Sequence, residues 1–272
     1  MAGDSANMSK NTPQLWDQVW KSAPPTEEDV FRLAVAENSL RWQQIEGVVM
    51  KEFSSFANLR VIEIGSGAGT HAALMSKRGA KVTLLDFSQE ALNRARGFFE
   101  SNRLLAQAFI HQNALSLPAS LLEKYDISMS FGLAEHFRGA DRTKIIRAHF
   151  DLLKTGGLSF ILVPNKQNLP FRLYRYFAEA VGRWRFGEEY PFSSSELRDI
   201  CRQIGIREYS FLDGSLFYSF RIMSQLKIQR KLSGLRQRSD ALRIRKERGT
   251  FLNRYLSHDL ILCAKKPRRL LP

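Results

Sequence analysis

Cysteine is scarce in this chain, and its scarcity argues against two classes of protein. Among 272 residues there are only two cysteines, Cys201 and Cys263, which lie far apart in the sequence. Two cysteines are too few for a disulfide framework, and this spacing is not that of a metal-ligand pair. We therefore expect no bound metal ion, and a reducing compartment, the cytoplasm, as the location of the protein.

Long apolar runs are also missing. No segment approaches the roughly 18 consecutive apolar residues of a membrane-spanning helix. The first thirty residues carry acids, amides and two tryptophans where a signal peptide has a basic region and an apolar run, so we expect no signal peptide. With 44% hydrophobic residues the composition predicts an ordinary soluble globular protein with a proper core.

Acidic residues are scarce in only one part of the chain. Residues 1–165 hold 18 Lys and Arg against 17 Asp and Glu, whereas residues 166–272 hold 23 against 10. Nearly all of the net charge of +14 therefore belongs to the C-terminal part. Such a surface attracts nucleic acid, phospholipid head groups or an anionic substrate, or it is only a solvated basic face.

From residue 59 onward, short apolar runs alternate with longer amphipathic segments. The predicted strands are 59–65, 80–87, 106–112, 125–132, 158–165, 206–214 and 257–266. The predicted helices are 12–22, 27–53, 70–79, 88–102, 141–157 and 193–205. We expect the helix over 141–157 to end in paired glycines. Residues 215–255 are basic and mostly helical in pattern. Strands alternating with helices predict an α/β fold with a buried, mostly parallel sheet.

The stretch VIEIGSGAGT, residues 61–70, joins the first predicted strand to a helix. Its alternating glycines, Gly65, Gly67 and Gly69, allow close approach of backbone to a ligand, and the helix N-terminus adds amide donors. A dinucleotide fingerprint needs its third glycine at position 70, where Thr70 stands. No Lys-Ser/Thr pair follows, so the phosphate-binding P-loop is excluded. The loop predicts a nucleotide-like ligand of another kind.

Two carboxylates accompany this loop. Asp86 ends the second predicted strand, where it can accept hydrogen bonds from both hydroxyls of a ribose. Glu63 lies on an otherwise apolar strand, and an unpaired buried charge there is costly. We expect Glu63 to have a partner, which a cationic cofactor could supply or organise.

The motifs VIEIGSGAGT, LLDFS, HQNAL, YDISMSFGLAEHF and LLKTGGLSFILVPN resemble, in order and spacing, those of class I S-adenosylmethionine-dependent methyltransferases of the type 11/12-like kind. The resemblance covers about residues 59–164, and HDLILCAKKP resembles the final strand of that family. It implies a Rossmann-like, seven-stranded, mostly parallel sheet with an antiparallel last strand and helices on both faces. It also implies S-adenosyl-L-methionine as the cofactor.

The resemblance assigns cofactor contacts residue by residue. The loop from Glu63 to Gly69 would hold the methionine part, Asp86 the ribose, and Asn113 the adenine amino group. Asn113 stands where Asp is frequent, and its carbonyl can accept the same hydrogen bond. The implied cofactor residues are Glu63, Gly65, Ser66, Gly67, Gly69, Asp86, Phe87, Ser88, Asn113, Ala114, Phe131, Gly132 and Leu133.

Methyl transfer is an in-line displacement that requires alignment, exclusion of water and, for a hydroxyl acceptor, a base. His136, in the loop after the fourth strand, is the candidate base, and Glu135 is a weaker one. The sequence Asn/Asp-Pro-Pro-Tyr/Phe, associated in this family with amide or adenine methylation, is absent there. A small-molecule acceptor is therefore favoured.

Acceptor identity should lie in the segments added to the core. Trp16 and Trp20, on the first helix, form a cover over the cofactor or belong to core packing. An aromatic and basic insert, residues 166–192, follows the fifth strand. It is loosely similar to an insertion in ubiquinone-biosynthesis O-methyltransferases. Its pattern suits a membrane interface or a cap packed on its own domain. The candidate substrate residues are Trp16, Trp20, Phe171, Tyr174, Arg175 and Trp184.

These observations give one preferred function and two alternatives. The preferred function is methyl transfer to an oxygen or nitrogen of a small-molecule or lipid-linked metabolite, with peripheral contact to an anionic membrane. One alternative is an RNA methyltransferase, because phosphate contacts would suit the basic residues 221–249. The other is a catalytically inactive SAM-binding partner protein. The predicted parts are a helical lid (1–57), the cofactor-binding core (58–165), the cap insertion (166–192) and the C-terminal completion (193–272) with a basic insertion at about 215–256.

Overall fold

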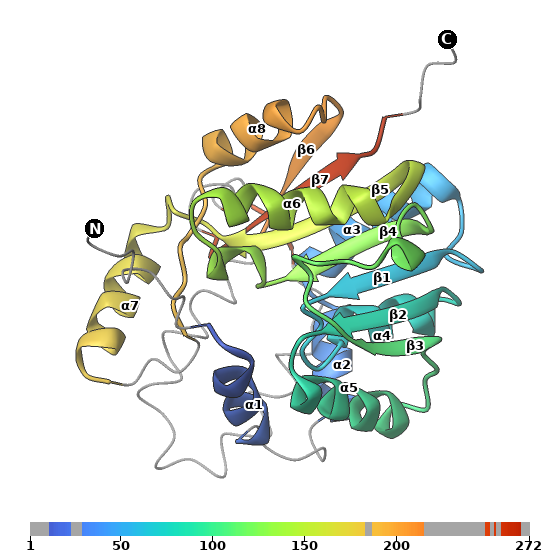
Figure 1. Cartoon of the computed structure of the whole chain (residues 1–272), viewed down its shortest axis with the longest axis horizontal. Coiled ribbons are helices and arrows are strands. Elements are labelled where there is room, and N and C mark those ends of the chain that lie inside the picture. The colour runs from blue at the N-terminus through green and yellow to red at the C-terminus, as the bar shows by residue number, and fades with distance from the viewer. Residues whose placement is uncertain are drawn as a thin grey trace, which may run out of the picture.

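The computed structural model describes residues 11–22, 29–182, 187–214, 248–250, 253 and 257–267. Within them a seven-stranded sheet forms the centre of the molecule, in the order β3-β2-β1-β4-β5-β7-β6 (Figure 1). The strands are β1 (Arg60–Ile64), β2 (Lys81–Asp86), β3 (Ala108–His111), β4 (Tyr125–Phe131), β5 (Leu153–Pro164), β6 (Tyr209–Asp213) and β7 (Asp259–Lys265). β7 pairs antiparallel with both β5 and β6, and the pairings among β1 to β5 in this sheet are parallel. The predicted fold class is confirmed.

Helices cover both faces of the sheet. They are α1 (Pro13–Lys21), α2 (Asp29–Glu37), α3 (Leu40–Phe53), α4 (Thr70–Lys77), α5 (Gln89–Ser101), α6 (Ala140–Leu152), α7 (Leu169–Ala180) and α8 (Ser194–Gln203), with short 3-10 turns η2 (Ala119–Leu121) and η3 (Ala134–His136). One core cluster contains residues of α3, α4 and α5, and a second contains residues of α6 and α8. Figure 1 shows α6 and α8 together on one side of the sheet.

Two predicted helices differ from the structure. The segment 27–53 was expected to form one helix, but it breaks at Ser39, whose hydroxyl accepts the Trp42 amide and caps α3. The prediction that a helix over 141–157 ends in paired glycines is wrong, because α6 ends at Leu152. Gly156 (φ 81°) and Gly157 instead lie within β5, where the register against β4 shifts. A Cβ on Gly157 would be 3.0 Å from the Asp126 carbonyl oxygen, so the tight bulge favours glycine there.

The sheet order places a ligand site at one edge. From β1 the chain proceeds to β2 and β3 on one side, and the order then continues through β4 and β5 on the other. Ligands of open α/β sheets bind at such a switch point, outside the carboxyl ends of the strands. Residues that follow β1, β2 and β4 therefore share one site.

The added segments are described in part. α7 lies in the predicted cap insertion, whereas residues 183–186 and most of the basic insertion at 215–256 are outside the described residues. The domain boundaries remain predictions. The described helices include none that is both long and apolar enough to cross a membrane.

Candidate functional site

The loop after β1 leaves no room for side chains at its glycines. Gly65, Gly67 and Gly69 have φ angles of 59°, 51° and 69°, the left-handed region that favours glycine. A Cβ on Gly65 would be 2.6 Å from Leu133 Cδ1, and one on Gly67 would be 2.5 Å from Trp20 Cζ2. At these glycines the loop therefore presents backbone without side chains of its own, and Leu133 and Trp20 lie against it.

The polar groups of this loop fit a nucleoside-containing cofactor. Ser66 is buried and its hydroxyl has no hydrogen-bond partner among the described residues. Such a buried polar group calls for a ligand or water. Asp86 is buried at the end of β2, and its carboxylate accepts the Gly67 amide at 2.9 Å and the Ser88 amide at 3.0 Å. The pKa of Asp86 is raised, because burial raises it by more than these amide hydrogen bonds lower it.

Glu63 has its partner within the chain. Its Oε2 accepts the amide of Ala72, in the first turn of α4, at 2.8 Å. Glu63 thus has the partner that we expected, and the N-terminus of α4 supplies it as an amide donor. Burial, and to a smaller extent the nearby Asp86 charge, raise the pKa of Glu63 to about 8, although the hydrogen bond from Ala72 lowers it.

The predicted adenine side is more open. Asn113 is exposed, and its Oδ1 accepts the Leu115 amide at 2.9 Å, while Ala114 is buried. The Phe87 carbonyl interacts with His111 Nε2 at 2.9 Å. Ser88 caps α5 by accepting the Ala91 amide.

Helix α1 lies across this edge of the sheet. Trp20 contacts Gly67, and the Asp17 carboxylate accepts a hydrogen bond from the Ser88 hydroxyl at 2.5 Å. One turn earlier in the same helix, Trp16 makes an edge contact with the ring of His136, with 4.8 Å between centroids. The helix thus spans from the predicted ribose site to the loop after β4, which supports the expectation of a cover.

The loop after β4 brings the two candidate catalytic groups into the interior. His136 is buried, and its Nδ1 lies 2.9 Å from the Glu188 carbonyl oxygen. Burial lowers the pKa of His136 to about 4, so the ring is neutral at pH 7. Glu135 is buried beside it, and its Oε2 has no partner among the described residues. Burial and the charge of Glu189 raise the pKa of Glu135 well above its usual value.

Sequence reasoning missed Glu189. One ligand-type atom from each of Glu135, His136 and Glu189 lies within 4.8 Å of the others. Arg175 forms ion pairs with Glu179 and Glu189, and burial raises the pKa of Glu189 to about 7. Because Glu189 is 53 positions from His136 and follows no motif, only the fold brings them together.

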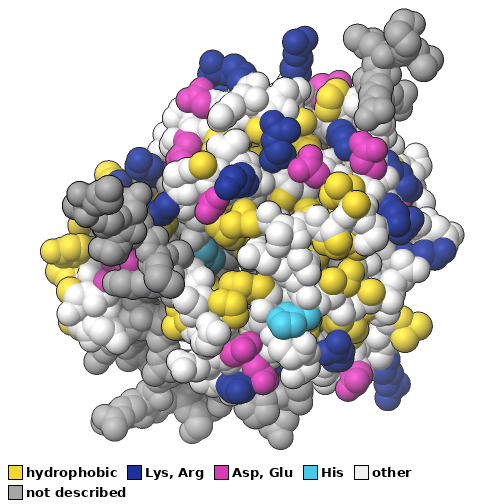
Figure 2. All heavy atoms as spheres, viewed as in Figure 1, with side chains coloured by type: hydrophobic (Ala, Val, Ile, Leu, Met, Phe, Trp, Pro, Cys, Tyr) yellow, Lys and Arg dark blue, Asp and Glu magenta, His cyan; other side chains and the backbone are white. Residues whose placement is uncertain are grey.

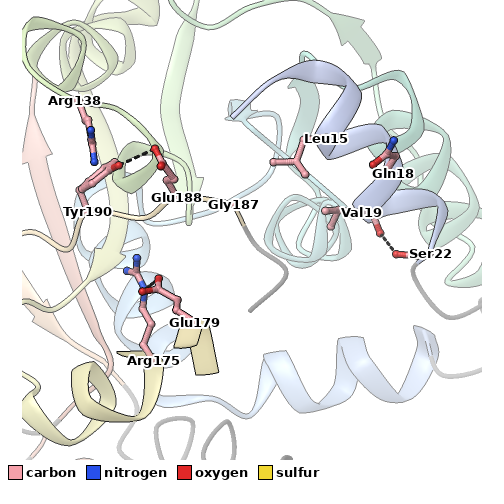
Figure 3. Close-up of a pocket in the computed structure, with 10 residues that line it drawn as sticks. All are labelled: Leu15, Gln18, Val19, Ser22, Arg138, Arg175, Glu179, Gly187, Glu188 and Tyr190. Carbon is pink, nitrogen blue, oxygen red and sulfur yellow. Dashed lines mark hydrogen bonds and ion pairs between the residues drawn. The ribbon is translucent and has the colours of Figure 1, made fainter. Parts of the chain in front are cut away.

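A pocket of about 850 Å³ adjoins these residues (Figure 3). Leu15 and Val19 of α1 point into it from one side, opposite Arg175 and Glu188. Arg138 lies over the Tyr190 ring at 3.9 Å from its centroid, and the Tyr190 hydroxyl donates to Glu188. Lining residues are Leu15, Gln18, Val19, Ser22, Arg138, Arg175, Glu179, Gly187, Glu188 and Tyr190.

Only some of the candidate substrate residues lie at the pocket or at His136. Arg175 lines the pocket, and Trp16 lies on His136. Phe171 is buried against His258 and Tyr174, and neither Phe171 nor Tyr174 lines the pocket. Trp184 lies outside the described residues.

Comparisons with known proteins agree with this geometry. Residues 61–157 match the family described as "Methyltransferase domain". The chain is 32% identical to a ubiquinone biosynthesis O-methyltransferase of Ruegeria pomeroyi, over 56% of this chain and 61% of that protein. It is 28% identical to the protein of that name from Caulobacter vibrioides, over 66% of this chain and 70% of the relative. The first two curated relatives are covered over only 61% and 53% of their own length.

Solved structures share the fold. Magnesium protoporphyrin IX methyltransferase from Synechocystis PCC 6803, with bound SAH, has a TM-score of 0.54 at 15% identity and covers 93% of each chain. A structure from work on echinomycin biosynthesis has a TM-score of 0.59 at 18% identity, over 95% of this chain and 94% of that one. Residues 61–157 therefore belong to the methyltransferase domain family, and the glycine loop with the buried Asp86 fits S-adenosylmethionine as its cofactor.

Proposed function

We propose that this protein transfers a methyl group from S-adenosylmethionine to an oxygen or nitrogen of a small-molecule or lipid-linked acceptor. The observation that carries the proposal is the position of α1. Its Trp20 lies on the glycine loop, its Trp16 lies on His136, and its Leu15 and Val19 line the adjoining pocket. Donor and acceptor sites would thus be neighbours under one helix.

Each part of the site has a distinct task in this reaction. The cofactor supplies an electrophilic methyl group on a sulfonium. The glycine loop and Asp86 would hold the nucleoside, and α1 would exclude water from the reacting atoms. His136 is our candidate for the base that accepts the acceptor's proton, because its neutral ring can do so. Glu135, with its unpartnered oxygen, is the alternative.

Calorimetry with S-adenosylhomocysteine tests the cofactor site. We expect Asp86→Ala to abolish or greatly weaken binding, because the ribose loses its acceptor. Asp126→Ala is the matched control, since Asp126 begins β4 at the opposite edge, where it pairs with Lys154 and the Arg60 amide. Unchanged binding by Asp86→Ala would refute the assignment.

A screen with labelled S-adenosylmethionine over extracted metabolites then tests the reaction. We expect label in a small-molecule or lipid fraction, and His136→Gln to reduce the rate without reducing cofactor affinity. Label in RNA, with binding that weakens steeply as salt rises, would favour the RNA alternative. Cofactor binding without any transfer would favour the inactive partner.

Peripheral contact with an anionic membrane belongs to the same proposal. Along α7 and just beyond it, apolar side chains at helical spacing face solvent. Leu169, Leu173, Tyr176, Phe177 and Val181 are each 60% to 67% exposed. Figure 2 shows hydrophobic side chains at the edge of the molecule where α7 lies in Figure 1. An exposed apolar stripe beside cations suits a bilayer interface, reached from the cytoplasm.

Liposome sedimentation tests this contact. We expect Leu173→Glu to reduce binding to vesicles that contain anionic lipid. Leu105→Glu is the matched control, because Leu105 is 86% exposed and lies between α5 and β3, away from α7. Equal binding by the Leu173 variant and the wild type would refute the membrane role of α7.

A further inference from the structure

His71 is a buried histidine at the switch point of the sheet. It is the second residue of α4, directly after the glycine loop, and is only 8% exposed. Its ring stacks on Phe131, the last residue of β4, with 3.5 Å between centroids and 11° between planes. Because β1 pairs with both β2 and β4, this stack lies where the glycine loop meets the end of β4.

Its ring nitrogens differ from those of the other buried histidines. His149 Nδ1 interacts with the Ile145 carbonyl, and its Nε2 with the Ser130 hydroxyl. His136 Nδ1 interacts with the Glu188 carbonyl. For His71, the described part of the chain supplies a ring contact but no hydrogen bond. Because His71 is 8% exposed, its ring nitrogens remain accessible to water or to a ligand in the site.

The order of the strands indicates which part of the cofactor lies nearest. Asp86 ends β2, on one side of β1, so the ribose belongs there. His136 and the pocket follow β4, on the other side. A cofactor with its ribose at Asp86 and its methyl group towards His136 would therefore cross β1 between β2 and β4. The amino-acid part then falls beside the first turn of α4 and His71.

The charge of the ring suits a neutral donor. Burial, and secondarily the positive charge of Arg41, hold the pKa of His71 well below its usual value. A neutral imidazole has one N–H donor. The N-terminus of α4 adds a favourable field for an anion, and its Ala72 amide is already taken by Glu63.

We propose that His71 binds the α-carboxylate of the methionine part of the cofactor through a ring N–H, and that Phe131 holds the ring in the required plane. This inference rests on the proposed cofactor site. The family motifs assign no role to His71, which directly follows the glycine loop and Thr70. His71 is thus a cofactor-binding residue for one defined portion of the ligand.

Two probes separate this portion from the remainder. S-adenosylhomocysteine carries the amino-acid part, whereas 5′-methylthioadenosine lacks it. His71→Phe keeps a ring for stacking on Phe131 but removes the donor. We expect calorimetry to show S-adenosylhomocysteine bound about 10- to 100-fold more weakly, as for the loss of a hydrogen bond to a charged group. Affinity for 5′-methylthioadenosine should stay within about twofold. His71→Asn, which retains an N–H donor, should restore part of the loss.

Other outcomes overturn the inference. Equal weakening for both probes would mean that His71 only supports the loop, and unchanged affinities would mean that it contributes nothing. Should the Phe variant fail to fold, ¹⁵N spectra of wild-type histidine rings decide the question, because only S-adenosylhomocysteine should shift the His71 signal. Asp86→Ala must weaken both probes. If it weakens neither, the proposed cofactor site fails, whatever His71 does.

Discussion

The Trp20 indole lies directly on Gly67, so that a Cβ on this glycine would be 2.5 Å from Cζ2. A nucleoside that uses the glycine loop must share this space with the indole or stack on it. We therefore expect intrinsic fluorescence to change when S-adenosylhomocysteine binds, and the change to disappear in Trp20→Phe. Trp42, buried in the core, serves as the control position. The same change in wild type and Trp20→Phe would contradict the contact.

The Asp17 carboxylate joins α1 to the start of α5. It accepts the Ser88 hydroxyl at 2.5 Å and the Glu90 amide at 3.3 Å. In Asp17→Ala we expect α1 amides to exchange hydrogen faster and S-adenosylhomocysteine to bind several-fold more weakly. Asp199→Ala, in an exposed pair with Arg202, should change neither. Unaltered exchange in α1 would show that this bond does not hold the helix.

Glu63 predicts a defined pH dependence of stability. Burial raises its pKa to about 8, so the folded state holds the proton more tightly than the unfolded state, whose pKa is near 4.5. Its contribution to stability is therefore full below pH 4.5 and is lost as the pH rises to about 8. Glu63→Gln, which can still accept the Ala72 amide, removes this titration. Denaturant unfolding at pH 5 and pH 8 should show a smaller loss of stability in the variant than in the wild type. Parallel losses would refute the assignment.

The buried pair Arg94 and Asp29 predicts the cost of breaking a contact between α2 and α5. Asp29 is fully buried and receives two hydrogen bonds from Arg94, at 2.7 and 2.5 Å. Asp29→Ala leaves a charge without its partner, so we expect the free energy of unfolding to fall by about 3–5 kcal/mol. Asp199→Ala breaks an exposed pair and should cost less than about 1 kcal/mol. Denaturant titration checks both, and similar small losses would contradict the argument.

The sheet was predictable because its signals are local. Each strand is a short apolar run bounded by turn residues, and Ser88 and Ser193 cap the helices that follow them. The break at Ser39 and the bulge at Gly156 were not predicted. A serine within a helical sequence pattern can cap a new helix or lie inside a continuous one, and the sequence does not distinguish the two. Paired glycines are compatible with a helix end or with a β-bulge, and only the partner strand decides between them.

The candidate site was predictable only where a motif carries it. The glycines and Asp86 lie at fixed positions relative to strands, and the structure brings them together. Glu189 and His71 could not be assigned, because their significance depends on contacts across the fold: one with Glu135 and His136, the other with Phe131. The sequence around a histidine that follows a glycine loop does not indicate which aromatic ring the histidine will stack on.

Helix α1 has a consequence for binding order. It contacts the glycine loop through Trp20 and the acceptor side through Trp16, so one nine-residue helix forms a boundary of both sites. The ligand that binds first changes the conformational freedom of α1. It therefore changes the free-energy cost of ordering α1 when the second ligand binds. Thermodynamic linkage then requires the effect to be mutual: the factor by which bound donor changes affinity for acceptor equals the factor by which bound acceptor changes affinity for donor.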